Sequence, residues 1–344
     1  MGRCRSLSLA AAAVATAATF AAPATAKELV YSIIGGGPNH PYNAQIVNGW
    51  AKDVAKATKG RVTVKVLPSP AAPPPRLYDA VRKNIVDVAH TFNGFLQKTA
   101  PLIQVSMLPL IFTTSEANSV ALWRTYEKFF KTKNQFPGVK LLGFASNPGG
   151  ISCSLKGPIK SVSDIRKLKM WSLPGYSAKA LGVLGVTIVP GPAVRMYPLI
   201  SKGTVDGFTG ISMFDVQGFK VDKFAKSCTV FPGAIFTATF SMFMNQKTWE
   251  ALSPADQKGV MSVSGEAFAR KITLLDELEK KALATFKAEG KTINVAEGAF
   301  ADEVRAAWTP MQAAWIAQAK KSGVDGKAVL DFYMATAKAV AAGK

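Results

Sequence analysis

The sequence contains few of the residues on which catalysis and metal binding usually depend. Its 344 residues include 2 histidines and 3 cysteines, with no Cys-x-x-Cys pair and no histidine cluster. A zinc or iron–sulfur site therefore has no support. The nucleophile elbow, the P-loop and the G-x-G-x-x-G fingerprint are also missing, and Gly35-Gly36-Gly37 is interpreted as only a flexible turn. The sequence therefore predicts a protein that binds without turnover, with no catalytic residue, cofactor or metal.

Acidic residues are also scarce, and the chain is strongly basic. It has 42 lysines and arginines against 22 aspartates and glutamates, a formal net charge of +20. Such a charge is compatible with nucleic acid or an anionic membrane as a partner. The lysines are spread thinly, however, as in Lys128, Lys131 and Lys133, and no nucleic-acid-binding motif is present. We therefore interpret the charge as a solvated surface and expect no nucleic-acid partner.

The first 26 residues have the pattern of a secretory signal peptide. Arg3 and Arg5 precede a small, apolar run from 7 to 22, and Ala24-Thr25-Ala26 provides small residues for cleavage. The alternative, a transmembrane anchor, is disfavoured because the run is rich in alanine and threonine rather than leucine. We expect a cleaved signal peptide and a freely soluble periplasmic protein.

Two cysteines, Cys153 and Cys228, remain in the chain after cleavage. In an oxidising periplasm they are able to form a disulfide. Two buried thiols that pack as small apolar residues are an equally good interpretation. The sequence leaves both possibilities open.

The rest of the chain alternates between strand and helix signals. Apolar strands are predicted at 28–34, 61–67 and 86–91, with helices at 42–58 and 76–83 between them. This order is typical of a parallel α/β sheet, in which ligands bind at the carboxyl ends of the strands. Since about 318 residues exceed what a single core usually accommodates, we expect two lobes.

Motifs further along the chain resemble a known family. Leu168-Lys169-Met170, Gly185, Pro190, Tyr197 and Val205-Asp206-Gly207 follow in the order and spacing of the solute-binding proteins of TRAP transporters, the DctP family. The resemblance extends over most of the mature chain. It implies an α/β, two-lobed periplasmic-binding-protein fold with a long C-terminal helix that spans both lobes. It also implies capture of a small organic ligand by cleft closure and delivery to TRAP membrane permease subunits.

The resemblance also suggests how the chain divides. We expect 1–26 as the signal peptide, 27–145 plus 233–265 as lobe one, and 146–232 plus 266–344 as lobe two. The spanning helix would start at Ser253-Pro254 and run about 35 residues to Gly290, near 50 Å. A break at Gly259 or Gly265 is the alternative. Two further helices, 301–321 and 327–341, are expected to pack on lobe two.

The predicted ligand pocket departs from the family pattern. Where the family places an arginine that clamps the ligand's carboxylate, this sequence has Trp171; a second basic position corresponds to Ile151, and Gly210 replaces an asparagine. An indole has a single donor and cannot replace a guanidinium clamp. The resemblance thus implies a flatter and less cationic pocket. Packing between the lobes, outside the pocket, is the alternative role for Trp171.

Two ligand classes are consistent with this change. Trp171 with the phenylalanines of the region would stack an aromatic ligand or hold an amine by cation–π attraction, worth about 0.5 to 2 kcal/mol. Alternatively, Arg195, near Tyr197, provides a displaced carboxylate clamp. We favour an organic acid with an aromatic or apolar body over an amine or neutral ligand. The phenylalanines in question are Phe92, Phe208, Phe214 and Phe236.

Further candidates lie in the loops after the first strands. His40, with Asn39 beside it, is either a donor to the ligand or a histidine that holds its own loop. Phe92 and Asn93 are pocket candidates because they follow a strand at its carboxyl end. For His90, inside that strand, core packing or a strand-end hydrogen bond is favoured.

The predicted function is that of a monomeric extracytoplasmic solute-binding protein of a TRAP-type transporter. The alternative from another class is a periplasmic ligand sensor that presents its solute to a receptor.

Overall fold

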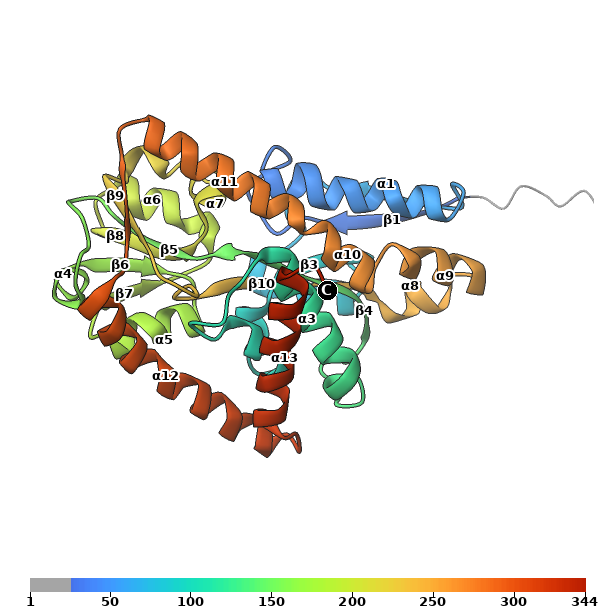
Figure 1. Ribbon diagram of the computed structural model, residues 1–344. Helices are drawn as coiled ribbons and strands as arrows, with labels where there is room; N and C mark the ends of the chain where they lie inside the picture. Colours follow the sequence, from blue (N-terminus) through green and yellow to red (C-terminus); the bar gives the residue numbers. More distant parts are fainter. Residues whose placement is uncertain (1–25) are drawn as a thin grey trace, which may run out of the picture.

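The computed structural model describes residues 26–344, which form a mixed α/β protein with two sheets and many helices (Figure 1). The predicted signal peptide lies outside the described residues, apart from its last residue. Among the described residues, no helix combines the length and apolarity that a bilayer crossing requires.

The first lobe is built around a five-stranded sheet of order β2-β1-β3-β10-β4. β1 pairs in parallel with β2 and β3, while β10 is antiparallel to both of its neighbours. The three strands predicted at the start of the chain are confirmed; β1 buries Leu29 and Tyr31, and every residue of β3 is buried. The strands are β1 (Lys27–Ser32), β2 (Val62–Val66), β3 (Val88–Phe92), β4 (Val139–Gly149) and β10 (Thr237–Asn245).

The second lobe is built around a six-stranded sheet of order β11-β9-β5-β8-β6-β7. A disulfide joins Cys153 on β5 to Cys228 on β9, which are opposite each other in the antiparallel pairing and 75 residues apart in the chain. Of the two possibilities left open by the sequence, the structure therefore has the disulfide. The strands are β5 (Ile151–Ser154), β6 (Lys169–Ser172), β7 (Thr187–Pro190), β8 (Gly207–Ile211), β9 (Ser227–Val230) and β11 (Thr292–Val295).

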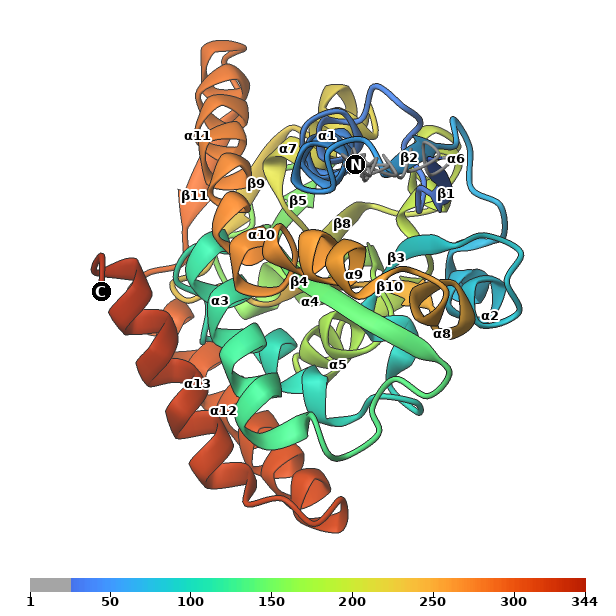
Figure 2. The same ribbon diagram turned by 90° about the vertical axis from the view of Figure 1, so that its right-hand side faces the viewer.

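Helices cover both sheets (Figures 1 and 2). α1 (Asn48–Ala57) follows a π-helical turn, η1 (Tyr42–Val47), and buries Trp50 and Val54. The other α-helices before residue 251 are α2 (Leu77–Arg82), α3 (Ser115–Thr125), α4 (Val162–Arg166), α5 (Tyr176–Val183), α6 (Met196–Ser201), α7 (Met213–Gly218) and α8 (Gln246–Glu250). Short 3-10 or π-helical turns are η2 (Pro74–Arg76), η3 (Asn93–Leu96), η4 (Leu102–Met107), η5 (Tyr126–Phe130), η6 (Ala193–Arg195) and η7 (Asp222–Phe224).

The expected long helix that spans both lobes is present as a series of three helices, so only the expectation of one uninterrupted helix of about 35 residues is wrong. They are α9 (Pro254–Ser262), α10 (Gly265–Lys271) and α11 (Thr273–Ala288). The alternative break at Gly265 is confirmed: this residue has φ +56°, and a Cβ there would lie 2.7 Å from the Trp123 ring. The predicted start is also confirmed, because Ser253 Oγ accepts a hydrogen bond from the Asp256 amide at 3.1 Å.

The two C-terminal helices pack on different lobes. α12 (Gly298–Lys321) contacts α4 and α5 of the second lobe, as expected. α13 (Gly326–Ala341) turns back and packs on α3 of the first lobe (Figures 1 and 2). The expectation that both helices pack on lobe two is therefore wrong for α13, whose Leu330 and Tyr333 join the first-lobe core. The exact lobe boundaries stay a prediction.

Candidate functional site

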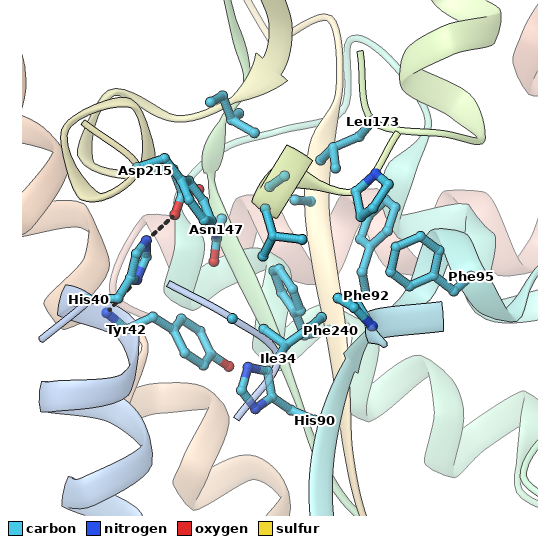
Figure 3. A pocket seen from close by; sticks show the side chains of 18 residues that line it. Ile34, His40, Tyr42, His90, Phe92, Phe95, Asn147, Leu173, Asp215 and Phe240 are labelled. Atoms are coloured by element: carbon cyan, nitrogen blue, oxygen red, sulfur yellow. Dashed lines mark hydrogen bonds and ion pairs between the residues drawn. The ribbon is translucent and has the colours of Figure 1, made fainter. Parts of the chain in front are cut away.

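A cavity of about 70 Å³ lies between the two lobes (Figure 3). The first lobe contributes the carboxyl ends of β1 and β3 and the start of β10, and the second lobe contributes the segments 192–194 and 215–219. This position matches the rule that ligands bind at the carboxyl ends of parallel strands. The volume is several times the roughly 15 Å³ that one water needs, so the cavity has room for a small solute.

One side of the cavity is aromatic. The Phe92 ring meets Phe95 edge-on at 5.2 Å between centroids and Phe240 at 6.0 Å. Leu173, from the loop after β6, faces these rings from the second lobe (Figure 3). These side chains form an apolar wall that suits the flat face or edge of a ring.

The polar side in the first lobe is organised around His90. Tyr31 Oη lies 2.8 Å from His90 Nδ1, and the Tyr42 ring stacks on the imidazole at 4.9 Å between centroids. His90 Nε2 has no hydrogen-bond partner among the described residues. Burial, and to a smaller extent the charge of His40, lowers the pKa of His90 to about 3, so this histidine is neutral at physiological pH.

A second polar group joins the lobes. His40 Nε2, from the loop after β1, lies 3.6 Å from Asp215 Oδ1 on α7 (Figure 3). Asp215 Oδ2 accepts hydrogen bonds from Asn147 Nδ2 at 2.7 Å and Ser212 Oγ at 2.9 Å. Burial raises the pKa of Asp215 and lowers the pKa of His40, and each partner's charge partly opposes the shift of the other.

The glycine loop before His40 is shaped for this contact. Asn43 Nδ2 donates to the carbonyls of Gly35 and Gly37, both at 2.8 Å. A Cβ on Gly36, which has φ +74°, would lie 2.6 Å from the His40 ring. Gly35-Gly36-Gly37 forms a turn, and the close approach of Gly36 to the His40 ring requires a residue without a Cβ there.

Two of the candidates from the sequence line the cavity, namely His40 and Phe92. His90 lines it as well and also makes the predicted strand-end hydrogen bond, to Tyr31. Asn39 is exposed and lies on an outer groove that His40 also borders. Asn93 is buried in a hydrogen-bond network with Thr239 and Ser241 and does not line the cavity.

The aromatic cluster expected around Trp171 is not assembled at the cavity. Trp171 and Phe208 are opposite each other on β6 and β8, and both are fully buried in the second lobe. Trp171 thus lies outside the cavity lining, and the alternative role, packing between the lobes, stays a prediction. Gly210 has φ +88°, and a Cβ on it would collide with the Ser177 hydroxyl. Phe236 lies behind Phe92, and Phe214 packs against His40 from outside the lining.

The displaced carboxylate clamp is also not at the cavity. Arg195 and Tyr197 are exposed, and the Tyr197 hydroxyl accepts a hydrogen bond from Lys223 Nζ at 3.1 Å. Among the described residues that line the cavity, none is a lysine or an arginine. No group of three or more potential metal ligands occurs in residues 26–344.

Several residues that line the cavity are not among those predicted from the sequence. Phe95 lies three residues after Phe92, near the end of a predicted strand. The rule that ligands bind at the carboxyl ends of strands could therefore have identified it. Tyr42 is the first residue of the helix after the glycine loop, close to the end of β1, so the same rule could have identified it. Asp215 and Asn147 carry no local signal, because only the folded chain brings α7 and β4 together.

Comparison with known proteins places this geometry in context. The model of the family "Bacterial extracellular solute-binding protein, family 7" (DctP) matches residues 35–321. A curated relative from Comamonas testosteroni, named outer membrane transporter protein TsaT, is 37% identical over 302 residues, which are 88% of this chain and 89% of that protein.

Solved structures of similar fold contain aromatic acids. A TRAP periplasmic solute-binding protein from Bordetella bronchiseptica, with bound (R)- and (S)-mandelate, is 29% identical with a TM-score of 0.87 and covers 91% of this chain and 99% of its own. A TRAP solute-binding protein from Rhodoferax ferrireducens, in complex with copurified benzoate, is 25% identical with a TM-score of 0.83. That match covers 90% of this chain and 97% of the benzoate-binding one.

Proposed function

This chain belongs to family 7 of the bacterial extracellular solute-binding proteins, the DctP family, and we propose that it captures a small aromatic carboxylic acid for a TRAP transporter. It is a binding protein and not an enzyme, as the family assignment indicates. The observation that carries the choice of ligand is the cavity itself, which has an aromatic wall on one side and hydrogen-bonding groups on the other.

The ligand class has two independent supports. The wall of Phe92, Phe95 and Phe240 is suited to a ring, and the opposite side offers donors to an acid group from Tyr42 and His90. The structural neighbours from Bordetella bronchiseptica and Rhodoferax ferrireducens contain mandelate and benzoate. Both ligands combine one ring with one carboxylate, which is the combination that such a cavity accommodates.

Capture proceeds by closure of two lobes. The first is formed by 27–145 plus 233–265, with α13 packed on it, and the second by 146–232 plus the rest of 266–344. A solute that binds between the lobes and touches both of them favours the closed form over the open one. The pair His40 and Asp215, which joins the lobes beside the cavity, supports this proposal. The closed protein is then recognised by the membrane subunits of the permease.

The site of action is the periplasm. The N-terminal pattern of a signal peptide supports export, and the family is extracytoplasmic. We expect the protein to act there as a monomer.

The test is a binding screen combined with mass spectrometry of small molecules released from freshly purified protein. We expect an aromatic monocarboxylate among the released molecules, and benzoate or mandelate should raise the melting temperature. A screen in which only sugars or inorganic ions raise the melting temperature would exclude the proposal.

A matched pair of variants links this binding to the cavity. Phe95 and Phe129 are both half-buried, but only Phe95 lines the cavity. Phe95→Ala should weaken benzoate binding about tenfold, because roughly 1.5 kcal/mol of apolar contact is lost. Phe129→Ala should leave the affinity unchanged.

A further inference from the structure

The cavity presents an electrostatic problem for an anionic ligand. Asp215 is a buried carboxylate on its lining, and no lysine or arginine of the described chain lines it. A carboxylate that enters such a site loses its hydration and meets a like charge. An unpaired second anion there would be strongly unfavourable, so the site must supply neutral donors and a compensating positive charge.

The neutral donors are present in the first lobe. The Tyr31 hydroxyl needs an acceptor, and among the described residues its partner is His90 Nδ1, at 2.8 Å. If Nδ1 accepts, the proton of the neutral imidazole is on Nε2, the atom that lacks a partner in the cavity. The Tyr42 side chain, whose ring stacks on the imidazole, also lines the cavity and has a hydroxyl donor. Together these groups offer two hydrogen-bond donors to one acid group.

The compensating charge has one evident location. We propose that the ligand's carboxylate binds together with one proton, which is taken up from solvent by the pair of His40 and Asp215. In the free site Asp215 is ionised. Binding adds the ligand anion and one proton. In the complex, the pair of His40 and Asp215 therefore has no net charge, either as an ion pair or as two neutral groups. The inference deepens the proposed function and rests on it: the ligand is an aromatic monocarboxylate recognised without a guanidinium.

Several other titratable groups surround this pair. Tyr42 on η1 and His90 on β3 face it from the first lobe. Burial raises the pKa of Glu279, on α11, to about 7, and the charge of Asp215 adds to this rise. Lys220 and Lys281 are exposed and border the outer groove on which His40 also lies. Because the pKa of Glu279 is about 7, this residue could also exchange a proton near neutral pH, and a measurement of proton uptake needs a Glu279 variant as a control.

The test is isothermal titration of the full mature protein with benzoate at about pH 8, in buffers that differ in ionisation enthalpy. Benzoate is fully ionised there, and burial keeps the pKa of His40 below its ordinary value of 6.5. We expect uptake of about one proton per benzoate and a dissociation constant that rises by up to tenfold per pH unit above neutrality. Benzamide, the neutral analogue, should bind without proton uptake.

Three variants locate the proton. Asp215→Asn keeps an acceptor for Ser212 and Asn147 but cannot ionise, so the uptake and the pH dependence should both disappear. Glu279→Gln should retain the uptake. Asp302→Asn, on the exposed surface of α12, is the matched control and should behave as the wild type.

Each other outcome overturns the inference. If benzoate binds to the wild-type protein with no proton exchanged, or with a proton released, the inference is wrong while the proposed function stands. If the uptake persists in Asp215→Asn, the proton resides elsewhere and the inference is wrong. If no aromatic acid binds at all, the proposed function fails and this inference fails with it. The wild-type comparison of benzoate with benzamide requires no variant to fold.

Discussion

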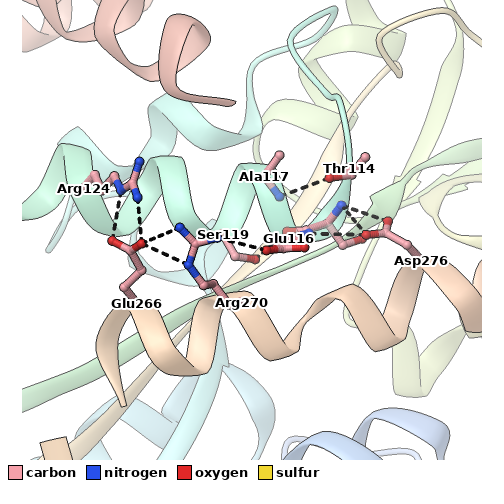
Figure 4. Close-up of polar contacts among 9 residues, drawn as sticks. Thr114, Glu116, Ala117, Ser119, Arg124, Glu266, Arg270 and Asp276 are labelled. Atoms are coloured by element: carbon pink, nitrogen blue, oxygen red, sulfur yellow. Dashed lines mark hydrogen bonds and ion pairs between the residues drawn. The ribbon is translucent and has the colours of Figure 1, made fainter. Parts of the chain in front are cut away.

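Two regions of the molecule differ in how their carboxylates and other polar groups are paired. At the junction of α3 with α10 and α11, the carboxylates are paired: Glu266 accepts from Arg124 and Arg270, and Asp276 accepts from the backbone amide of Ser115 (Figure 4). In the cavity, by contrast, His40 Nε2, His90 Nε2 and Asn147 Oδ1 have no hydrogen-bond partner among the described residues. Because an unpaired buried polar group costs about 1–3 kcal/mol, such groups call for an explanation.

The contrast separates stability from function. Paired groups at the junction hold the helices in place, whereas the unpaired groups of the cavity are available to a ligand. The junction also holds both lobes through one helix: Asp276 of α11 binds the start of α3, and Glu279, one turn later, accepts the amides of Met213 and Phe214 at the start of α7, each at 2.9 Å. Substitutions at the junction should therefore change stability, and substitutions in the cavity should change affinity.

The largest effect is expected for Asp276→Ala. This change leaves the Ser115 amide, which donates to Asp276 at 2.9 Å, without a partner at the start of α3. The free energy of unfolding should fall by about 1–3 kcal/mol, measured by urea denaturation, with benzoate affinity unchanged. Glu277→Ala is the control on the same helix, because its pair with Lys280 is solvent-exposed and should contribute nothing measurable. Equal losses for both variants would refute the role of Asp276.

The next effect concerns the dependence of stability on pH. Burial raises the pKa of Glu279 from 4.5 to about 7, so the folded state binds a proton more tightly than the unfolded state. Its contribution to stability is complete below about pH 4.5 and is lost as the pH rises towards 7, by at most about 1.4 kcal/mol per pH unit. Glu279→Gln should reduce this slope in denaturation curves between pH 5 and 7. Identical slopes in both proteins would show that Glu279 does not titrate there.

A third comparison uses two tyrosines. Tyr42→Phe removes a hydroxyl that lines the cavity and should raise the dissociation constant for benzoate about fivefold, with little change in stability. Tyr78→Phe removes a hydroxyl that donates to the Pro137 carbonyl at 2.8 Å, and it should cost about 1 kcal/mol of stability without changing affinity. If the two variants exchanged these effects, the division between the regions would be wrong.

The smallest effect is expected at Arg270. It bonds to Glu266 at 2.8 Å and lies 3.3 Å from Glu116, but its side chain is 44% exposed. Arg270→Ala should therefore lower the free energy of unfolding by less than about 1 kcal/mol, and the difference should shrink at high salt. A larger loss that does not depend on salt would contradict this expectation, because an exposed ion pair is weak and is screened by salt.

Much of the fold could be predicted from the sequence because it depends on local patterns. Apolar runs and, for β2, alternating apolar residues located the first three strands, and the Ser253-Pro254 cap located the start of α9. The single spanning helix failed at Gly265, where the close approach of Trp123 requires a glycine with positive φ. Local helix signals cannot register such a contact, because the two residues are far apart in the chain.

The cavity was harder to predict because its polar side is made by distant segments. His40 and Phe92 followed from the rule about strand ends, whereas Asp215 and Asn147 meet only through the packing of α7 on β4. The family position of Trp171 suggested a ligand contact, yet the side chain is fully buried in the second lobe. A family motif predicts the strand on which a residue lies, but the packing around that residue decides whether its side chain reaches the cavity.

The most direct test of the account is a crystal structure of the protein with benzoate. The account predicts the ring against Phe92, Phe95 and Phe240, and the carboxylate within hydrogen-bond distance of His90 Nε2 and the Tyr42 hydroxyl. A carboxylate held by a lysine or an arginine, or a benzoate bound outside this cavity, would contradict it.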